Sequence, residues 1–401
     1  MQIDTTPTQS SYDVVIIGGA MMGASVAWFL ANNPGFDGSV LVVERDPAYE
    51  LSSTAHSNSC IRQQFTQPIN VQVSQFGADY VRNFRQYMGG DPDVPELHMQ
   101  SFGYLYLAST AEGEQVLREA QKMQAAEGAG TQILTPDMLA EKFPFYNLDG
   151  IRVGSHNPVD EGYFDGGCMF DWWRRKARAA GVEYIRNEVT DISTSAGRIS
   201  GVTLADGTNV GAGHVVNAAG PRAGLVAQMA GVSLPVEPRK RYTFVFEAAR
   251  PLDVDLPLTV DPSGVHVRSD GKYYMAGCPP HEDPAVAPDD FIADHSLWEE
   301  KVWLAIADRI PQFDALKLMQ SWVGHYAYNT LDQNAIIGPH PEVENFMLIN
   351  GFSGHGLQQA PAMGRGLAEW IVTGRYETLD LSPFAFDRIP AGRPLLEQAV
   401  I

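Results

Sequence analysis

VVIIGGAMMGASVAWFL, residues 14–30, begins as an apolar run, turns on small residues and continues with apolar side chains at helical spacing. The four β-branched residues before the turn are typical of a strand buried on both faces of a parallel sheet. The apolar side chains after the turn predict a helix that ends at NNPG, residues 32–35. A second apolar strand follows in SVLVVERD, residues 39–46. Together the three pieces predict a βαβ unit of about 30 residues.

The turn of this unit has the composition of a dinucleotide-binding turn. Gly18 and Gly23 occupy the first and third glycine positions of that motif, while Ala20 replaces the middle glycine and Gly19 beside it adds backbone freedom. Backbone amides at a helix N-terminus favour a negative charge such as a pyrophosphate. Glu44 ends the second strand, where a carboxylate accepts hydrogen bonds from an adenosine ribose and repels a 2′-phosphate. The alternative is a short turn that binds no ligand. Such a turn does not require an acidic residue at the end of the second strand, so a nucleotide site is favoured.

Length, composition and charge narrow the class of protein. The 401 residues include 44% hydrophobic and 19% charged residues, which is typical of a globular chain with two domains or interleaved lobes. The net charge of -20 disfavours nucleic acid as a partner and predicts a local cluster of arginines if the ligand is an anion. Three widely spaced cysteines indicate neither a disulfide framework nor a metal site. A polar N-terminus without a long apolar run predicts neither export nor a transmembrane segment, so the cytoplasm is the expected location.

Three further segments distinguish FAD from NAD as the dinucleotide. LSSTAHSNSCIRQQF, residues 51–65, is too polar for a core element and predicts a ligand-lining loop. GHVVNAAGPRAG, residues 213–224, predicts a strand that closes on small residues. Residues 344–374 predict a strand, a glycine-rich turn and a helix. The amides of that last helix can stabilise the negative charge that reduction places near flavin N1, whereas a reduced nicotinamide is neutral, so FAD is favoured.

In this order, the segments resemble the glycine oxidase, sarcosine oxidase and D-amino-acid oxidase family of FAD flavoproteins. The resemblance covers nearly the whole chain and is carried by YDVVIIGGAMMG, VVERD, SSTAHSNSCIRQQF, VVNAAGPRAG, WVGHYAYNTLDQNAIIGPHP and GFSGHGLQQAPAMG. It implies an α/β (α+β) fold, with a Rossmann-like FAD-binding domain of the glutathione-reductase type and a second, mainly antiparallel β-sheet substrate domain. We expect residues 1–80, 151–235 and 336–401 to form the discontinuous FAD-binding domain, and residues 81–150 and 236–335 to form the substrate-binding cap.

The resemblance also implies which residues hold FAD. His325 stands where some sarcosine oxidases attach flavin through a cysteine, so noncovalent FAD is expected. The expected cofactor-binding residues are Gly18, Gly19, Ala20, Met21, Met22, Gly23, Glu44, Arg45, Ser52, Ser53, Thr54, Ser59, Cys60, Val189, Ala218, Ala219, Gly220, Gly351, Gly354, His355, Gly356, Leu357 and Gln358.

Four residues are expected at the catalytic end. Arg62 occupies the position at which this family often binds the substrate carboxylate, and Arg268 is a second candidate because a guanidinium suits a carboxylate. Gln358 stands where sarcosine oxidases have a carboxylate-binding lysine. His355 lies in the same glycine-rich turn, although a histidine there is more often a packed hydrogen-bonding residue than a general base.

The reaction that the resemblance implies is oxidation of the C–N bond of a small secondary or D-amino acid, such as a sarcosine-like compound or an iminodicarboxylate. Hydride transfer to flavin N5 is followed by hydrolysis of the imine. The lysine that assists O2 in those oxidases is absent from YYMAGCPPHEDPAV, so the acceptor is O2 or another compound. A 2-hydroxy acid dehydrogenase and a non-catalytic flavin-binding assembly protein are the alternatives. The sequence leaves the choice between monomer and homo-oligomer open.

Overall fold

The computed structural model describes residues 3–399, and its first sheet contains the predicted βαβ unit. Strand β1 pairs in parallel with β2 and β12, β2 pairs with β9, and β12 pairs with β19. Their bounds are β1 Ser11–Ile17, β2 Val40–Glu44, β9 Glu183–Arg186, β12 Asn209–Asn217 and β19 Phe346–Asn350. Antiparallel strands β10 and β11, Val189–Ser195 and Arg198–Leu204, and β18, Ile336–Pro339, extend this sheet.

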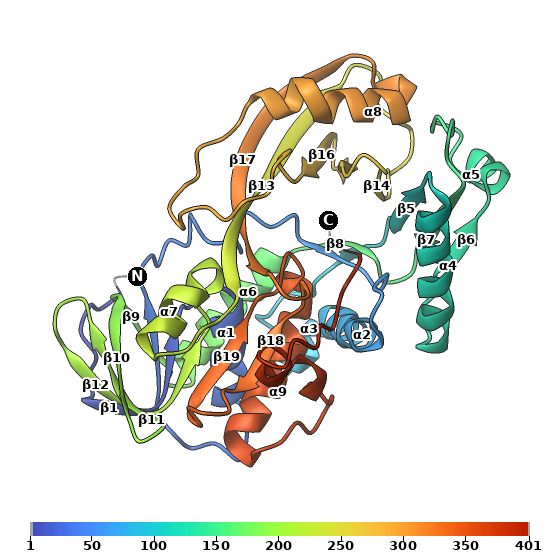
Figure 1. Ribbon diagram of the computed structural model, residues 1–401. Coiled ribbons are helices and arrows are strands. Elements are labelled where there is room, and N and C mark those ends of the chain that lie inside the picture. Colours follow the sequence, from blue (N-terminus) through green and yellow to red (C-terminus); the bar gives the residue numbers. More distant parts are fainter. Residues whose placement is uncertain (1–2, 400–401) are drawn as a thin grey trace.

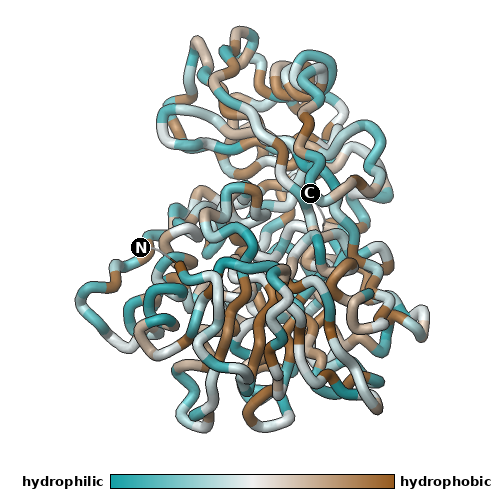
Figure 2. The backbone as a smooth tube through the Cα atoms, turned by 90° about the vertical axis from the view of Figure 1, so that its left-hand side faces the viewer, coloured by the Kyte–Doolittle hydropathy of each residue, from teal (hydrophilic) through white to brown (hydrophobic). Residues whose placement is uncertain are grey.

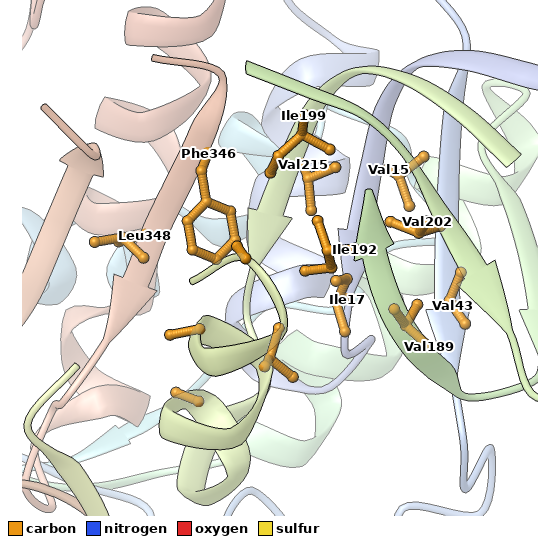
Figure 3. Close-up of a cluster of buried hydrophobic side chains, with 14 of the residues drawn as sticks. Val15, Ile17, Val43, Val189, Ile192, Ile199, Val202, Val215, Phe346 and Leu348 are labelled. Carbon is orange, nitrogen blue, oxygen red and sulfur yellow. The ribbon is translucent and has the colours of Figure 1, made fainter. Parts of the chain in front are cut away.

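The central strands are covered on both faces, which explains their unbroken run of β-branched residues. On one face Val14 and Ile16 pack with side chains of helices α1, Met21–Ala31, and α9, Gly356–Thr373. On the other face Val15 and Ile17 pack with the β10–β11 hairpin and with α7, Ala223–Met229 (Figure 3). The alternation of side chains along β1 thus supplies two separate hydrophobic cores.

A second sheet forms the upper part and right-hand side of the molecule in Figure 1. Its strand order is β17-β13-β16-β15-β14-β5-β7-β6, with antiparallel pairing except between β14 and β5. The bounds are β5 Tyr104–Ala108, β6 Gln132–Leu134, β7 Val153–Asn157, β13 Val236–Ala248, β14 Leu258–Val260, β15 His266–Asp270, β16 Tyr273–Cys278 and β17 Leu316–Asn329. Strand β13 pairs with β17 along its whole length, and the two strands form a long ribbon above the first sheet.

The remaining elements join and cover the two sheets. Strands β3 Cys60–Ile61, β8 Gly162–Phe164 and β4 Met99–Gln100 form a small sheet. The helices are α2 Pro68–Arg82, α3 Phe84–Tyr87, α4 Ala111–Ala126, α5 Pro136–Lys142, α6 Gly166–Ala179 and α8 Trp303–Arg309. Figure 2 shows apolar residues concentrated in the strands of the first sheet and hydrophilic ones on the outer loops. Within residues 3–399 there is no helix with the length and apolar character that crossing a bilayer requires.

The predicted fold class is confirmed, and one boundary of the predicted domains differs from the observed sheets. Strand β7 pairs with β5 and β6 in the second sheet, whereas the range 151–235 assigned it to the FAD-binding domain. Its sequence, VGSHN, has one apolar side chain and therefore no alternating pattern that would have marked it as a strand of the cap.

Candidate functional site

A cavity of about 450 Å³ lies between the two sheets. It is lined by the ends of β1, β2 and β12, by the N-terminal turns of α1 and α9, by the loop before β3, and by β13 and β17. Ligands of open α/β sheets bind at this place, beyond the carboxyl ends of parallel strands. The lining of the cavity includes both the end of β2 and the start of α9.

The first glycine turn leaves no room for side chains. Gly18 has a φ of +95°, and a Cβ atom on it would lie 2.6 Å from the carbonyl oxygen of Ala218. A Cβ atom on Gly23 would lie 1.9 Å from the carbonyl oxygen of Gly18, so this glycine is required for the helix to pack on the turn. Helix α1 has Ala20 at its N-cap position without a side-chain cap, and its first turn has no acidic residue. The turn therefore presents backbone and a positive helix end to the cavity, which suits a pyrophosphate.

Glu44 lies at the end of the cavity beside this turn. Its two carboxylate oxygens accept hydrogen bonds from the backbone amides of Gly19 and Asp46, each at 2.8 Å. Burial raises the pKa of Glu44, and the two amides oppose that rise. The carboxylate is thus held in place at the site where the sequence predicts a contact with the adenosine ribose.

The second glycine turn, before α9, also lines the cavity, and Gly356 lies beside Met22 of α1. Gly354 has a φ of +98°, and a Cβ atom on it would lie 2.4 Å from Cζ of Tyr326 on β17. Helix α9 has His355 at its N-cap position without a side-chain cap and has no acidic residue in its first turn. This end of the cavity therefore combines a positive helix end with an aromatic ring of the covering sheet.

Arg62 lies beside the α9 turn and is 1% exposed. Its backbone amide donates to Oε1 of Gln358 at 2.9 Å, and its guanidinium lies 2.9 Å from Nε2 of His355. The guanidinium also donates to the carbonyl oxygens of Gln64 and Ala399 and lies over the ring of Phe65. The predicted catalytic residues Arg62, His355 and Gln358 are therefore in direct contact.

His355 is held as a neutral hydrogen-bond acceptor. Burial and the adjacent Arg62 guanidinium lower the pKa of His355 well below its ordinary value. Because a guanidinium has only donors, the Nε2 atom that faces Arg62 carries no proton. The geometry therefore gives His355 the task of orienting Arg62.

A buried carboxylate positions the segment that carries Arg62. Glu161 accepts hydrogen bonds from the amides of Gln63 and Gln64, from Nε2 of Gln64 and from Nδ2 of Asn157, at 2.6 to 3.1 Å. Burial raises the pKa of Glu161 to about 7, while these hydrogen bonds and Arg62 oppose the rise. No motif in the sequence marked this residue.

Most of the residues predicted from sequence share this one cavity. Its lining includes Gly18, Ala20, Met21, Met22, Glu44, Arg45, Ser52, Ser53, Thr54, Ser59, Cys60, Val189, Ala218, Ala219, Gly220, Gly354, His355, Gly356, Leu357, Gln358 and Arg62. Gly19, Gly23 and Gly351 belong to the two turns but are not among the lining residues.

Arg268 does not line the cavity. Its guanidinium donates to the carboxylate of Asp270 at 2.9 Å and to the carbonyl oxygens of Ser269 and Asn58 at 2.7 and 3.1 Å. The side chain is 3% exposed, so these partners enclose it on β15.

Sequence reasoning missed Arg241 on β13, which does line the cavity. Its guanidinium forms a bidentate ion pair with Asp283, at 2.8 and 3.0 Å, and lies 4.6 Å from the ring centre of Tyr326. The sequence shows that residues 241–248 alternate as a strand, but it does not show which face of that strand meets the cavity.

Sequence reasoning also missed residues 279–293, which follow β16 and which we call the strap. Asp289 pairs with Arg45 at 3.2 Å and with Arg222, both beside the first sheet. The ring of Phe291 stacks on His325 at 4.2 Å, and Nε2 of His325 lies 2.8 Å from the carbonyl oxygen of Asp290. Through these contacts the strap links the covering sheet to the loops of the first sheet.

The comparisons with known proteins agree with this geometry. A family model described as FAD dependent oxidoreductase (DAO) matches residues 13–370. The chain belongs to this family. FAD-dependent oxidoreductase domain-containing protein 1 of Bos taurus is 40% identical over 97% of this chain and 87% of its own length. Sarcosine oxidase subunit beta of Arthrobacter sp is 27% identical, with 96% and 92% covered.

Among solved structures, L-proline dehydrogenase from P. horikoshii superposes with a TM-score of 0.84 at 25% identity, over 96% of this chain and 99% of that one. Membership in the FAD-dependent oxidoreductase family confirms FAD as the cofactor and an oxidoreductase as the class of enzyme. The two glycine turns and the cavity that both of them line fit this cofactor, because a dinucleotide needs a diphosphate cradle and a separate place for its flavin ring.

Proposed function

We propose that this oxidoreductase removes a hydride from the C–N carbon of a small secondary or D-amino acid and releases an imine that water hydrolyses. The observation that carries the proposal is Arg62, a buried guanidinium at the α9 turn inside the cavity. A carboxylate is the anion that a guanidinium binds best by geometry and charge. The proposal extends to the predicted cofactor contacts of the two turns and of the loop at residues 51–65.

The relatives support a secondary amine as the substrate class. One is named sarcosine oxidase subunit beta and another L-proline dehydrogenase, and both named substrates are secondary amino acids. In this chain, Arg62 would bind the carboxylate and thereby place the substrate nitrogen and the adjacent carbon beside the α9 turn. Bound FAD supplies the hydride acceptor at its N5 atom.

The cavity itself favours the reactive form of the substrate. An amine loses a hydride only when it is unprotonated, and burial next to positive charges disfavours the ammonium form. The guanidinium of Arg62 lines the cavity, and His355 beside it is neutral. Hydride transfer from an unprotonated amine needs no general base on the enzyme. This agrees with the structure, in which Nε2 of His355 accepts from Arg62.

The remaining properties follow from composition and sequence. We propose noncovalent FAD, O2 or another compound as electron acceptor, and the cytoplasm as location. The three cysteines form no disulfide, which agrees with a reducing compartment.

The experiment is anaerobic reduction of the purified flavoprotein. Sarcosine, L-proline, iminodiacetate and D-alanine are added in turn, and we expect at least one to bleach the flavin absorption band. Analysis for the carbonyl product and the released amine separates amine oxidation from oxidation of a 2-hydroxy acid, which releases no amine. The proposal is wrong if dithionite bleaches the band and none of the amino acids does. Readmission of air then shows whether O2 accepts the electrons.

A further inference from the structure

Arg241 lies at the same end of the cavity as Arg62 but on the opposite wall. It projects from β13 of the covering sheet, whereas Arg62 lies in the loop beside α9. The Tyr326 ring lies against Gly354 of the α9 turn, and the Arg241 guanidinium lies 4.6 Å from the centre of that ring. Both guanidiniums act on the Tyr326 hydroxyl: burial raises the pKa of Tyr326, and Arg241 and Arg62 oppose the rise. Tyr326 is therefore within electrostatic reach of both arginines.

The present partners of the Arg241 guanidinium are a carboxylate on the strap and the carbonyl oxygen of Lys240, the latter at 2.7 Å. Asp283 takes both terminal nitrogens of the guanidinium, at 2.8 and 3.0 Å, while Nε of Arg241 is buried without a hydrogen-bond partner among the described residues. The same carboxylate lies 3.5 Å from Arg239, whose side chain neighbours that of Arg241 over Tyr328. Arg239 can therefore retain Asp283 when Arg241 turns to another anion.

The geometry points to a second anion-binding group in the substrate site: we propose that Arg241 binds a carboxylate of the substrate other than the one held by Arg62. The substrate class is then a dicarboxylic secondary amino acid, and Asp283 occupies Arg241 until that carboxylate arrives. The inference rests on the proposed function for the identity of the reacting bond, but not for the binding of the two carboxylates.

Two unreactive ligands test the binding directly, because a thioether sulfur replaces the nitrogen and no C–N bond is present. Thiodiacetate has two carboxylates and (methylthio)acetate has one. Each is titrated into the FAD-loaded enzyme, and the perturbation of the flavin spectrum gives its Kd. We expect thiodiacetate to bind more tightly, and Arg241→Gln to weaken it by roughly ten- to a hundredfold while changing (methylthio)acetate by less than about twofold. Arg250→Gln removes an exposed ion pair just after β13, with Asp314, and should change neither Kd.

A second variant keeps Arg241 and removes its competitor. Asp283→Asn should tighten thiodiacetate and leave (methylthio)acetate unchanged, whereas a merely structural ion pair predicts no gain for either ligand. Equal effects of Arg241→Gln on both ligands, or equal affinity of the natural enzyme for both, would overturn the inference. If thiodiacetate is preferred through Arg241 but no amino acid bleaches the flavin, the proposed function fails and the inference stands. If amino acids bleach the flavin but Arg241→Gln changes the reduction by sarcosine and by iminodiacetate equally, only the inference fails.

Discussion

Glu161 offers a quantitative test of how the site is held together. It is fully buried, accepts four hydrogen bonds and adjoins the segment that carries Arg62. Burial raises its pKa from 4.5 to about 7. Between these two values the folded protein holds a proton that the unfolded chain releases, so the free energy of unfolding must fall as the pH rises through this window. The difference corresponds to about 3 kcal/mol.

The perturbation is Glu161→Gln, which keeps the shape of the side chain and removes its titration. Urea unfolding of both proteins is measured with saturating FAD from about pH 5 to about pH 8. The free energy of unfolding of the natural protein, minus that of the variant, should fall by about 2 to 3 kcal/mol across this range. Other titrating groups cancel in this difference, and Glu141→Gln, at an exposed position, should give a flat one.

A flat difference for Glu161→Gln would refute the reasoning. It would mean that four hydrogen-bond donors and the nearby Arg62 outweigh burial and keep the carboxylate ionised throughout. The variant would then be less stable at every pH, because one amide hydrogen of the new side chain would face the donors that now point at the carboxylate.

Three further predictions concern the turns and the C-terminal segment. Gly23→Ala should weaken FAD binding by roughly tenfold or more, measured as flavin retained after gel filtration, because its Cβ would overlap the backbone of the turn. Glu397→Ala should lower the free energy of unfolding by about 1 to 3 kcal/mol in urea, because the buried Nδ2 of Asn70 and the half-buried amide of Thr66 lose an acceptor. His355→Phe should raise KM for the amino acid more than it lowers kcat, because Arg62 loses an acceptor that orients it.

Each of these predictions has a matched control. Gly167→Ala, in the exposed first turn of α6, should retain flavin, and Gln398→Ala, exposed beside Glu397, should unfold at the same urea concentration as the natural protein. His355→Gln can still accept from Arg62, so its KM should rise less than that of His355→Phe. Full flavin content in Gly23→Ala, unchanged stability in Glu397→Ala, or identical kinetics in His355→Phe and His355→Gln would each contradict the corresponding argument.

The two glycine turns were predictable because their chemistry is local. Gly18 and Gly354 need their positive φ values within a few residues of the strand and helix that they join, so the pattern along the chain carries the signal. The surroundings of Arg62 have no such signal. Its contact with the carbonyl oxygen of Ala399 joins residues 337 positions apart, and no local pattern announces it. The sequence therefore predicts that Arg62 is in the site, but not what orients it.

The choice between Arg241 and Arg268 shows what sheet order adds to strand prediction. Both arginines lie in strands that the alternating pattern predicts, and the pattern treats them alike. In the folded chain β13 is the neighbour of β17, and the register places Arg241 opposite Gly324, next but one to Tyr326. Arg268 lies two strands further along the sheet, opposite Met275. There its guanidinium donates a hydrogen bond to Asp270 of the same strand.

The order and register of the strands therefore place the Arg241 cation, and not that of Arg268, beside Tyr326 and the α9 turn. Exchanging Arg241 and Asp283, as Arg241→Asp with Asp283→Arg, keeps the ion pair but moves the cation onto the strap. We expect this double variant to remain folded and to lose the preference for thiodiacetate, as judged by urea unfolding and by the flavin titration. A preserved preference would mean that the net charge of the pair, and not the position of the arginine on β13, selects the ligand.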